Sequence, residues 1–184
     1  LEVPPTLDPT AAGNRLAGYA ARFDSVSELL SEKGRTFREV IRPGAFAATL
    51  RSSAPILALW NHGRDGRPPL GRTPTTLRLW EDAEGLRFEL DLPASAGDVR
   101  ESVARGDVRG MSFAMRKERD KWGWKDGVAF REIFGLDLVE ISPVVTPAYS
   151  QTSVGVRSAV VVPEPPAIVH VALARRKLQI LDQG

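Results

Sequence analysis

The sequence predicts a β-rich α+β fold, a closed or nearly closed antiparallel β-barrel of about seven short strands with a few peripheral helices. Two observations lead to this prediction. Most apolar stretches are short, and they either alternate with polar residues or lie between glycines and prolines, as strands do. Few stretches have the apolar spacing of an amphipathic helix. At 184 residues, the chain is long enough to bury one continuous core.

Alternation and bounded apolar runs mark the predicted strands. Residues 75–81 and 86–92 both alternate apolar with polar side chains, and the short Asp-Ala-Glu-Gly segment between them predicts a hairpin. Residues 56–60 form an apolar run between Pro55 and an Asn-His-Gly turn, which favours a buried strand. The same patterns predict the other strands, at residues 16–23, 39–41, 109–116, 128–134 and 136–145.

Two segments between these strands have helical features. Residues 43–51 begin with a proline suited to a first helical turn and continue with good helix formers. Residues 97–105 carry Val99 and Val103 four positions apart, and Gly106 is placed to end the helix. We therefore expect short helices beside the barrel.

Changes in composition divide the chain into three parts. Residues 1–14 are rich in proline, threonine and glycine and are expected to form a flexible N-terminal lead-in. Residues 15–157 contain the predicted strands and form the expected folded domain. Residues 158–184 begin as a proline-rich linker and end in a predicted short basic helix. Such a tail is accessible to proteolysis.

The composition argues against several classes of function. The 25 basic and 23 acidic residues leave a formal charge of +2, and the basic residues are scattered, so no nucleic-acid-binding surface is expected. No apolar stretch reaches the roughly 18 residues of a membrane span. The chain has no cysteine and two histidines, too few for a cysteine site or a His-rich zinc site. We therefore expect no metal, no cofactor, no nucleic acid and no membrane among its partners.

One serine and one histidine are candidates for a nucleophile and its base. Ser112 lies within the apolar segment 108–115, and it is not part of a Gly-x-Ser-x-Gly elbow because Ala114 replaces the second glycine. His62 follows an apolar run at a glycine turn, and an imidazole suits proton transfer near neutral pH. The other histidine, His170, lies beyond the proline-rich linker. Purely structural roles are the alternative for both residues, and a lone serine in a strand is more often structural than catalytic.

A serine and histidine pair also needs a third group that orients the imidazole. Asp137 and Glu140 lie three residues apart on one predicted strand, so strand alternation points their side chains to opposite faces. Only one of them can face His62. Glu140 shares its face with Leu136 and Leu138, where a carboxylate is costly unless it is paired. An exposed strand carboxylate is the alternative interpretation.

A set of short motifs runs in a fixed order over roughly residues 15–157. Together they resemble the motifs of the prohead maturation proteases of tailed bacteriophages, which share a fold with the herpesvirus capsid-assembly proteases. Each motif is weak alone, and their common order makes the resemblance specific. The motifs are Gly18-Tyr-Ala-Ala-Arg-Phe23, Arg42-Pro-Gly-Ala-Phe46, Leu59-Trp-Asn-His62, Leu70-Gly-Arg-Thr73, Gly85-Leu-Arg-Phe-Glu89, Leu92-Pro93, Arg105-Gly-Asp107, Gly110-Met-Ser-Phe113, Val139-Glu-Ile-Ser142 and Thr146-Pro-Ala148.

The resemblance implies a serine endopeptidase with a herpesvirus-protease-like fold. By position, Ser112 matches the nucleophile and His62 the base, and Glu140 is preferred as the third catalytic residue, with Asp137 as the alternative. The viral relatives use a second histidine in this third role. This chain has no histidine in the corresponding region, so a carboxylate has to substitute for it. By the same analogy, the oxyanion-stabilising backbone groups would lie near residues 142–146.

The resemblance also implies where the protein acts and on what. It would process scaffold segments and the major capsid protein, and shorten its own C-terminal tail, inside the prohead that is assembled in the host bacterial cytoplasm. A homodimer or a higher oligomer remains open, since the viral relatives are activated by dimerisation. A non-catalytic capsid assembly or scaffolding protein built on the same barrel is the alternative function.

Overall fold

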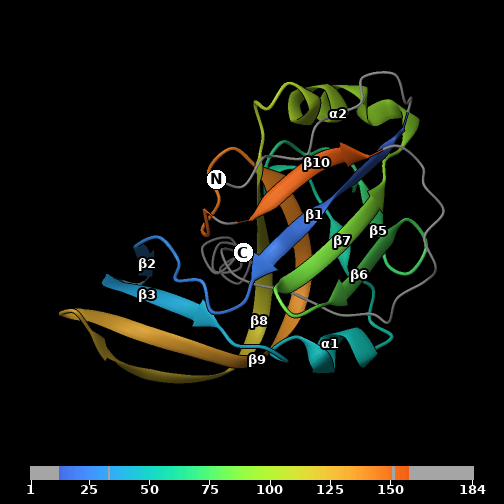
Figure 1. Cartoon of the computed structure of the whole chain (residues 1–184). Helices are drawn as coiled ribbons and strands as arrows, with labels where there is room; N and C mark the ends of the chain where they lie inside the picture. The colour runs from blue at the N-terminus through green and yellow to red at the C-terminus, as the bar shows by residue number, and fades with distance from the viewer. Residues whose placement is uncertain (1–12, 33, 151, 158–184) are drawn as a thin grey trace, which may run out of the picture.

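The computed structural model describes residues 13–32, 34–150 and 152–157, which form two β-sheets with a few short helices (Figure 1). All neighbouring strands of the first sheet are antiparallel. Its last two strands are the hairpin predicted from sequence alternation. In spatial order, the strands are β10 (Ser153–Arg157), β1 (Arg15–Arg22), β7 (Gly85–Asp91) and β6 (Leu77–Glu81).

The second sheet is built around strand β9 (Val128–Val144). Strand β8 (Gly110–Lys125) pairs with it in the antiparallel direction along nearly its whole length. Two further strands pair with β9 in the parallel direction, β3 (Arg35–Ile41) near its start and β4 (Leu57–Ala58) near its end. The edge strands are β2 (Leu30–Glu32), which pairs with β3, and β5 (Gly71–Arg72), which pairs with β4.

The predicted closed antiparallel barrel is wrong. Within the described residues both sheets are open, and the second sheet is mixed because β3 and β4 run parallel to β9. The described residues form 10 strands, more than predicted. Alternation of apolar and polar residues identifies a half-buried strand, but it identifies neither the neighbour of that strand nor its direction. The β-rich character with few helices is confirmed.

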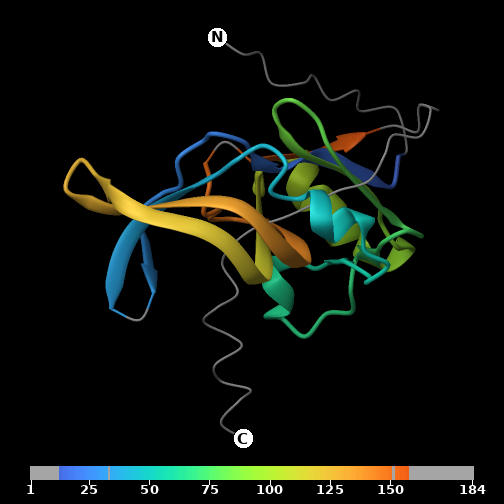
Figure 2. The same ribbon diagram turned by 90° about the horizontal axis from the view of Figure 1, so that it is seen from below.

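Strands β8 and β9 form one long hairpin of 16 and 17 residues. Its turn contains Asp126 and Gly127, both with positive φ (53° and 75°), as the favoured two-residue hairpin turns require. Figure 2 shows that the outer half of this hairpin extends away from the rest of the described chain, beside β2 and β3. The inner half enters the core and carries Ser112 and Glu140.

The helices are short and lie at the edges of the sheets (Figure 1). α1 (Ala47–Arg51) and α2 (Gly97–Ala104) fall within the two predicted helical segments. α2 buries Val99 and Val103, the pair whose spacing predicted it. Two 3₁₀ turns, η1 (Asn61–Gly63) and η2 (Ala94–Ala96), complete the helical elements. None of the helices among the described residues is both long and apolar enough to cross a membrane.

One hydrophobic core joins the two sheets and both α-helices. Among its largest fully buried side chains are Phe46, Phe88, Phe113, Tyr149, Leu16, Met111 and Ile141. The predicted basic tail, residues 158–184, and nearly all of the predicted lead-in lie outside the described residues. These segments and the domain boundaries therefore stay predictions.

Candidate active site

Ser112 lies on the inner half of β8, in register with Ser142 of β9. Directly paired residues of antiparallel strands project to the same face, so the two serine side chains face the same side of the sheet. Ser112 is fully buried, and its Oγ has no hydrogen-bond partner among the described residues. A buried hydroxyl without a partner is rare and costly, so Ser112 stands out among the buried polar groups.

His62 lies in η1, just after β4 leaves the sheet. The pairing of β4 with β9 continues through a hydrogen bond from the Leu59 N–H to the Ile141 carbonyl at 2.9 Å, which carries the chain along β9. Asn61, His62 and Gly63 then all have positive φ, at 44°, 61° and 65°. Asn and His are among the non-glycine residues that tolerate this left-handed region. The sharp turn brings the His62 ring back against β9.

Glu140 is the carboxylate that His62 contacts. The His62 Nδ1 lies 2.6 Å from Glu140 Oε1, and the two side chains are only 11% and 5% exposed. Ser142, two residues further along β9, donates a hydrogen bond from Oγ to Glu140 Oε2 at 2.6 Å. The same Ser142 Oγ accepts the His62 backbone N–H at 3.2 Å. Since Glu140 and Ser142 share a face and Ser112 lies opposite Ser142, all four side chains gather on one face of the β8–β9 pair.

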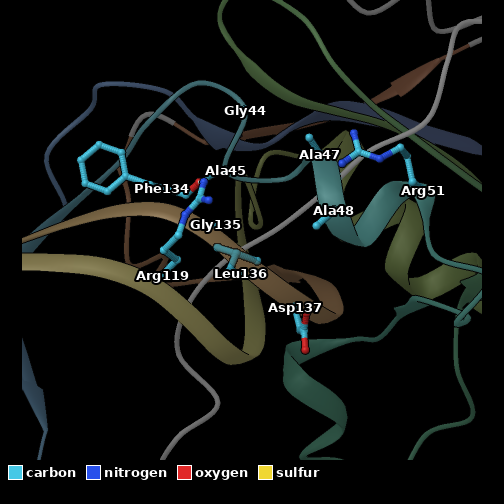
Figure 3. A pocket seen from close by; sticks show the side chains of 10 residues that line it. All are labelled: Gly44, Ala45, Ala47, Ala48, Arg51, Arg119, Phe134, Gly135, Leu136 and Asp137. Carbon is cyan, nitrogen blue, oxygen red and sulfur yellow. The ribbon is translucent and has the colours of Figure 1, made fainter.

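Asp137 lies in a different environment from Glu140, as strand alternation predicts. Its side chain is exposed and lines a surface concavity of about 400 Å³ (Figure 3). The cationic side chains of this concavity are Arg51 from α1 and Arg119 from β8. Neither Ser112 nor His62 lines it. The structure therefore brings Glu140, and not Asp137, to the His62 ring.

The hydrogen bonds of Ser142 were not predicted from the sequence. In the sequence, Ser142 ends the Glu-Ile-Ser motif and begins the segment considered for the oxyanion. Its spacing from Glu140 was the available signal, because residues two apart on a strand share a face. Its contact with the backbone of His62, 80 residues away in sequence, follows only from the tertiary structure.

The segment after β9 holds the strand around Ser112 from another side. Thr152 Oγ1 accepts the Met111 N–H at 2.9 Å and donates to the Met111 carbonyl at 2.8 Å. Tyr149 stacks on Phe113, with ring centroids 6.0 Å apart. Ser112 is therefore flanked on both sides by residues anchored to this segment, which makes its position well defined.

The cluster has no sign of a metal site. Among the described residues, no group of three or more histidine, cysteine, aspartate or glutamate side chains is arranged to hold a metal ion. The side chains that the cluster brings together are a hydroxyl, an imidazole and a carboxylate.

A serine, a histidine and a carboxylate on one buried face are the residue set of a serine hydrolase. Residues 4–162 of the 184 match the profile of the caudovirus prohead serine protease family, and the chain belongs to this family. Membership implies a serine peptidase that works in the phage prohead, among capsid and scaffold proteins. Searches of curated proteins and of solved structures found no match to the chain.

Proposed function

We propose that the protein is a serine endopeptidase in which Ser112 is the nucleophile, His62 the general base and Glu140 the residue that orients the imidazole. One observation carries this proposal. The buried contact between His62 and Glu140 lies on the same strand-pair face as the fully buried Ser112 hydroxyl, which has no hydrogen-bond partner among the described residues. Family membership supports the same class of reaction.

The contact between Glu140 and His62 selects the imidazole tautomer needed for this chemistry. A carboxylate only accepts hydrogen bonds, so the ring nitrogen next to it, Nδ1, carries the proton. The other ring nitrogen, Nε2, is then the basic one. As the reaction starts, Nε2 takes the proton of the Ser112 hydroxyl, and the nearby carboxylate stabilises the imidazolium that forms.

The reaction then proceeds by acyl transfer. Ser112 Oγ attacks the peptide carbonyl carbon, and the imidazolium returns its proton to the leaving amine as the peptide bond breaks. Water, deprotonated by His62, then hydrolyses the ester and frees Ser112. Backbone N–H groups have to stabilise the oxyanion in both steps. Because Ser112 is fully buried, binding of a substrate or of a small active-site probe has to open a path to its hydroxyl and bring it to Nε2.

The proposed substrates are the phage major capsid protein, scaffold segments and the C-terminal tail of the enzyme itself, inside the prohead. The family description supports the location and the reaction class. The tail, residues 158–184, has the proline-rich composition of an accessible linker, which suits self-cleavage.

Incubation of the full chain with its cognate capsid precursor tests this proposal. We expect cleavage by the wild type and none by Ser112→Ala or His62→Ala. Ser27→Ala is the matched control, because Ser27 is also a fully buried serine but its hydroxyl already bonds the Glu28 carbonyl and the Glu39 N–H. Binding of the precursor without cleavage by the wild type would instead support the non-catalytic scaffolding function.

A further inference from the structure

The hydroxyl of Ser142 closes a ring of contacts around the base and the carboxylate. It donates to Glu140 Oε2 at 2.6 Å and accepts the His62 backbone N–H at 3.2 Å, while Glu140 Oε1 contacts His62 Nδ1 at 2.6 Å. Each of the three residues thus contacts the other two. Ser142 is fully buried and Glu140 is 4% exposed, so water cannot easily replace these bonds.

We propose that Ser142 is a positioning residue that holds Glu140 and His62 in the geometry required for the reaction at Ser112. This inference rests on the proposed function. It adds a residue whose hydroxyl acts on the carboxylate and on the turn rather than on the reacting atoms.

The first action of Ser142 is on the carboxylate. The terminal torsion of a glutamate has a broad energy minimum, so one contact at Oε1 leaves the carboxylate plane free to turn. The bond from Ser142 to Oε2 fixes that plane. A buried carboxylate also has to be satisfied by donors, and Ser142 supplies one on the oxygen that His62 does not use. The direction of the Oε1 contact with the imidazole is thereby fixed.

The second action of Ser142 is on the turn that carries His62. This residue has a backbone φ of 61°, a left-handed conformation that His tolerates but that costs energy in any residue with a Cβ. The bond from the His62 N–H to Ser142 Oγ ties the turn to β9. One hydroxyl therefore holds both the backbone of the base and the carboxylate that orients its ring.

The arrangement also separates the roles of two serines that lie opposite each other. The Ser142 hydroxyl proton is directed at Glu140, whereas Ser112 Oγ has no partner among the described residues and can accept a new one. The geometry thus assigns the nucleophile to Ser112 and the supporting role to Ser142.

A fluorophosphonate probe tests this assignment without requiring a known peptide substrate. The nucleophilic serine oxygen displaces fluoride from phosphorus and the base takes the serine proton, so the labelling rate reports the serine, the base and the carboxylate together. We expect the full-length wild type to be labelled at Ser112. Ser142→Ala should still be labelled at Ser112, but about 10- to 100-fold more slowly, the effect of losing one hydrogen bond to a charged group. Ser27→Ala should stay within about two-fold of wild type.

Two further variants separate positioning from a merely structural role. Ser142→Thr retains the hydroxyl and should restore most of the labelling rate. In a Glu140→Gln background, where the carboxylate charge is gone, Ser142→Ala should slow labelling by less than about three-fold. A structural role would give the same slowing in both backgrounds, together with a matching fall in melting temperature, and would overturn the inference.

The remaining outcomes distinguish this inference from the proposed function. A wild type that is labelled at Ser112, with Ser142→Ala labelled equally fast, would overturn the role of Ser142 and leave the protease intact. Labelling of the wild type at Ser142 would reverse the two serines and overturn the assignment. A wild type that the probe does not label at any serine would contradict the proposed function itself.

Discussion

A charge cluster that joins strands β3, β8 and β9 provides the most quantitative prediction. Arg131 on β9 reaches Glu39 on β3 at 3.3 Å and Asp120 on β8 at 2.6 Å. The Arg131 and Glu39 side chains are 3% and 1% exposed. Tyr149 donates its hydroxyl hydrogen to Glu39 at 3.0 Å. Burial, followed by the charge of Glu39, raises the pKa of Tyr149 well above its ordinary value, so the phenol remains a donor.

Arg131→Met removes the cation, while the Glu39 carboxylate stays buried. Breaking a buried ion pair by removing one partner costs about 3–5 kcal/mol, more than the intact pair contributes, because the remaining charge is desolvated. For a chain of this size, each kcal/mol lowers the melting temperature by about 2–4 °C. We therefore expect Arg131→Met to lower the melting temperature by roughly 6–20 °C.

Urea and thermal unfolding followed by circular dichroism measure this effect. The matched control is Arg105→Met, because Arg105 pairs with Glu101 on the surface, where both side chains are more than half exposed, and should cost about 0–1 kcal/mol. The double variant Glu39→Gln with Arg131→Met removes both charges and keeps an acceptor for Tyr149. It should recover at least half of the loss. A single Arg131→Met variant within about 1 kcal/mol of wild type would refute the reasoning.

The other predictions concern the active site, the tail and acid stability. Glu140→Gln should slow capsid-precursor cleavage by about 10²- to 10⁴-fold while Asp137→Asn stays within about two-fold, because it is the Glu140 carboxylate that contacts the His62 ring. Equal losses would contradict the assignment. Mass spectrometry should find the wild type shortened within residues 158–184 and Ser112→Ala at full length; equal trimming of both would exclude self-cleavage. The hydrogen bond from Arg67 lowers the pKa of Asp98 from 3.8 to about 2. The ion pair therefore stabilises the fold at pH above 3.8, the pKa of this carboxyl in the unfolded chain, and the stabilisation is lost as pH falls toward 2. In urea titrations, Asp98→Asn should therefore flatten the dependence of the unfolding free energy on pH between about 2 and 3.8. An unchanged dependence on pH would contradict this role of the Arg67–Asp98 pair.

The sequence was most informative where a local pattern has a single structural solution. The alternation of residues 75–81 and 86–92 predicted the β6–β7 hairpin, and the spacing of Val99 and Val103 predicted the buried face of α2. Strand alternation also predicted that Asp137 and Glu140 point to opposite faces, and the structure places one in the solvent and the other against His62. These outcomes depend only on the periods of strands and helices.

The sheet topology could not be predicted in the same way. The pairing of β9 with β8 on one side, and with β3 and then β4 in parallel, depends on contacts between segments far apart in the chain. The same alternating pattern is compatible with a closed antiparallel barrel, which is why that prediction was wrong. The long hairpin was also predicted only in part: β9 was expected as two strands, at residues 128–134 and 136–145, and β8 as the shorter segment 109–116.

From the sequence, Ser112 and His62 were the candidates because a chain with two histidines and no cysteine offers few groups for this chemistry, and Glu140 was preferred to Asp137 as the third residue. Only the tertiary structure decided which of these residues come into contact. The parallel pairing of β4 with β9 and the left-handed turn after it bring His62 to Glu140, and the cross-strand register sets Ser142 opposite Ser112. The physical reason is that residue type limits what chemistry a chain can perform, whereas distances between residues far apart in sequence depend on how the whole sheet packs.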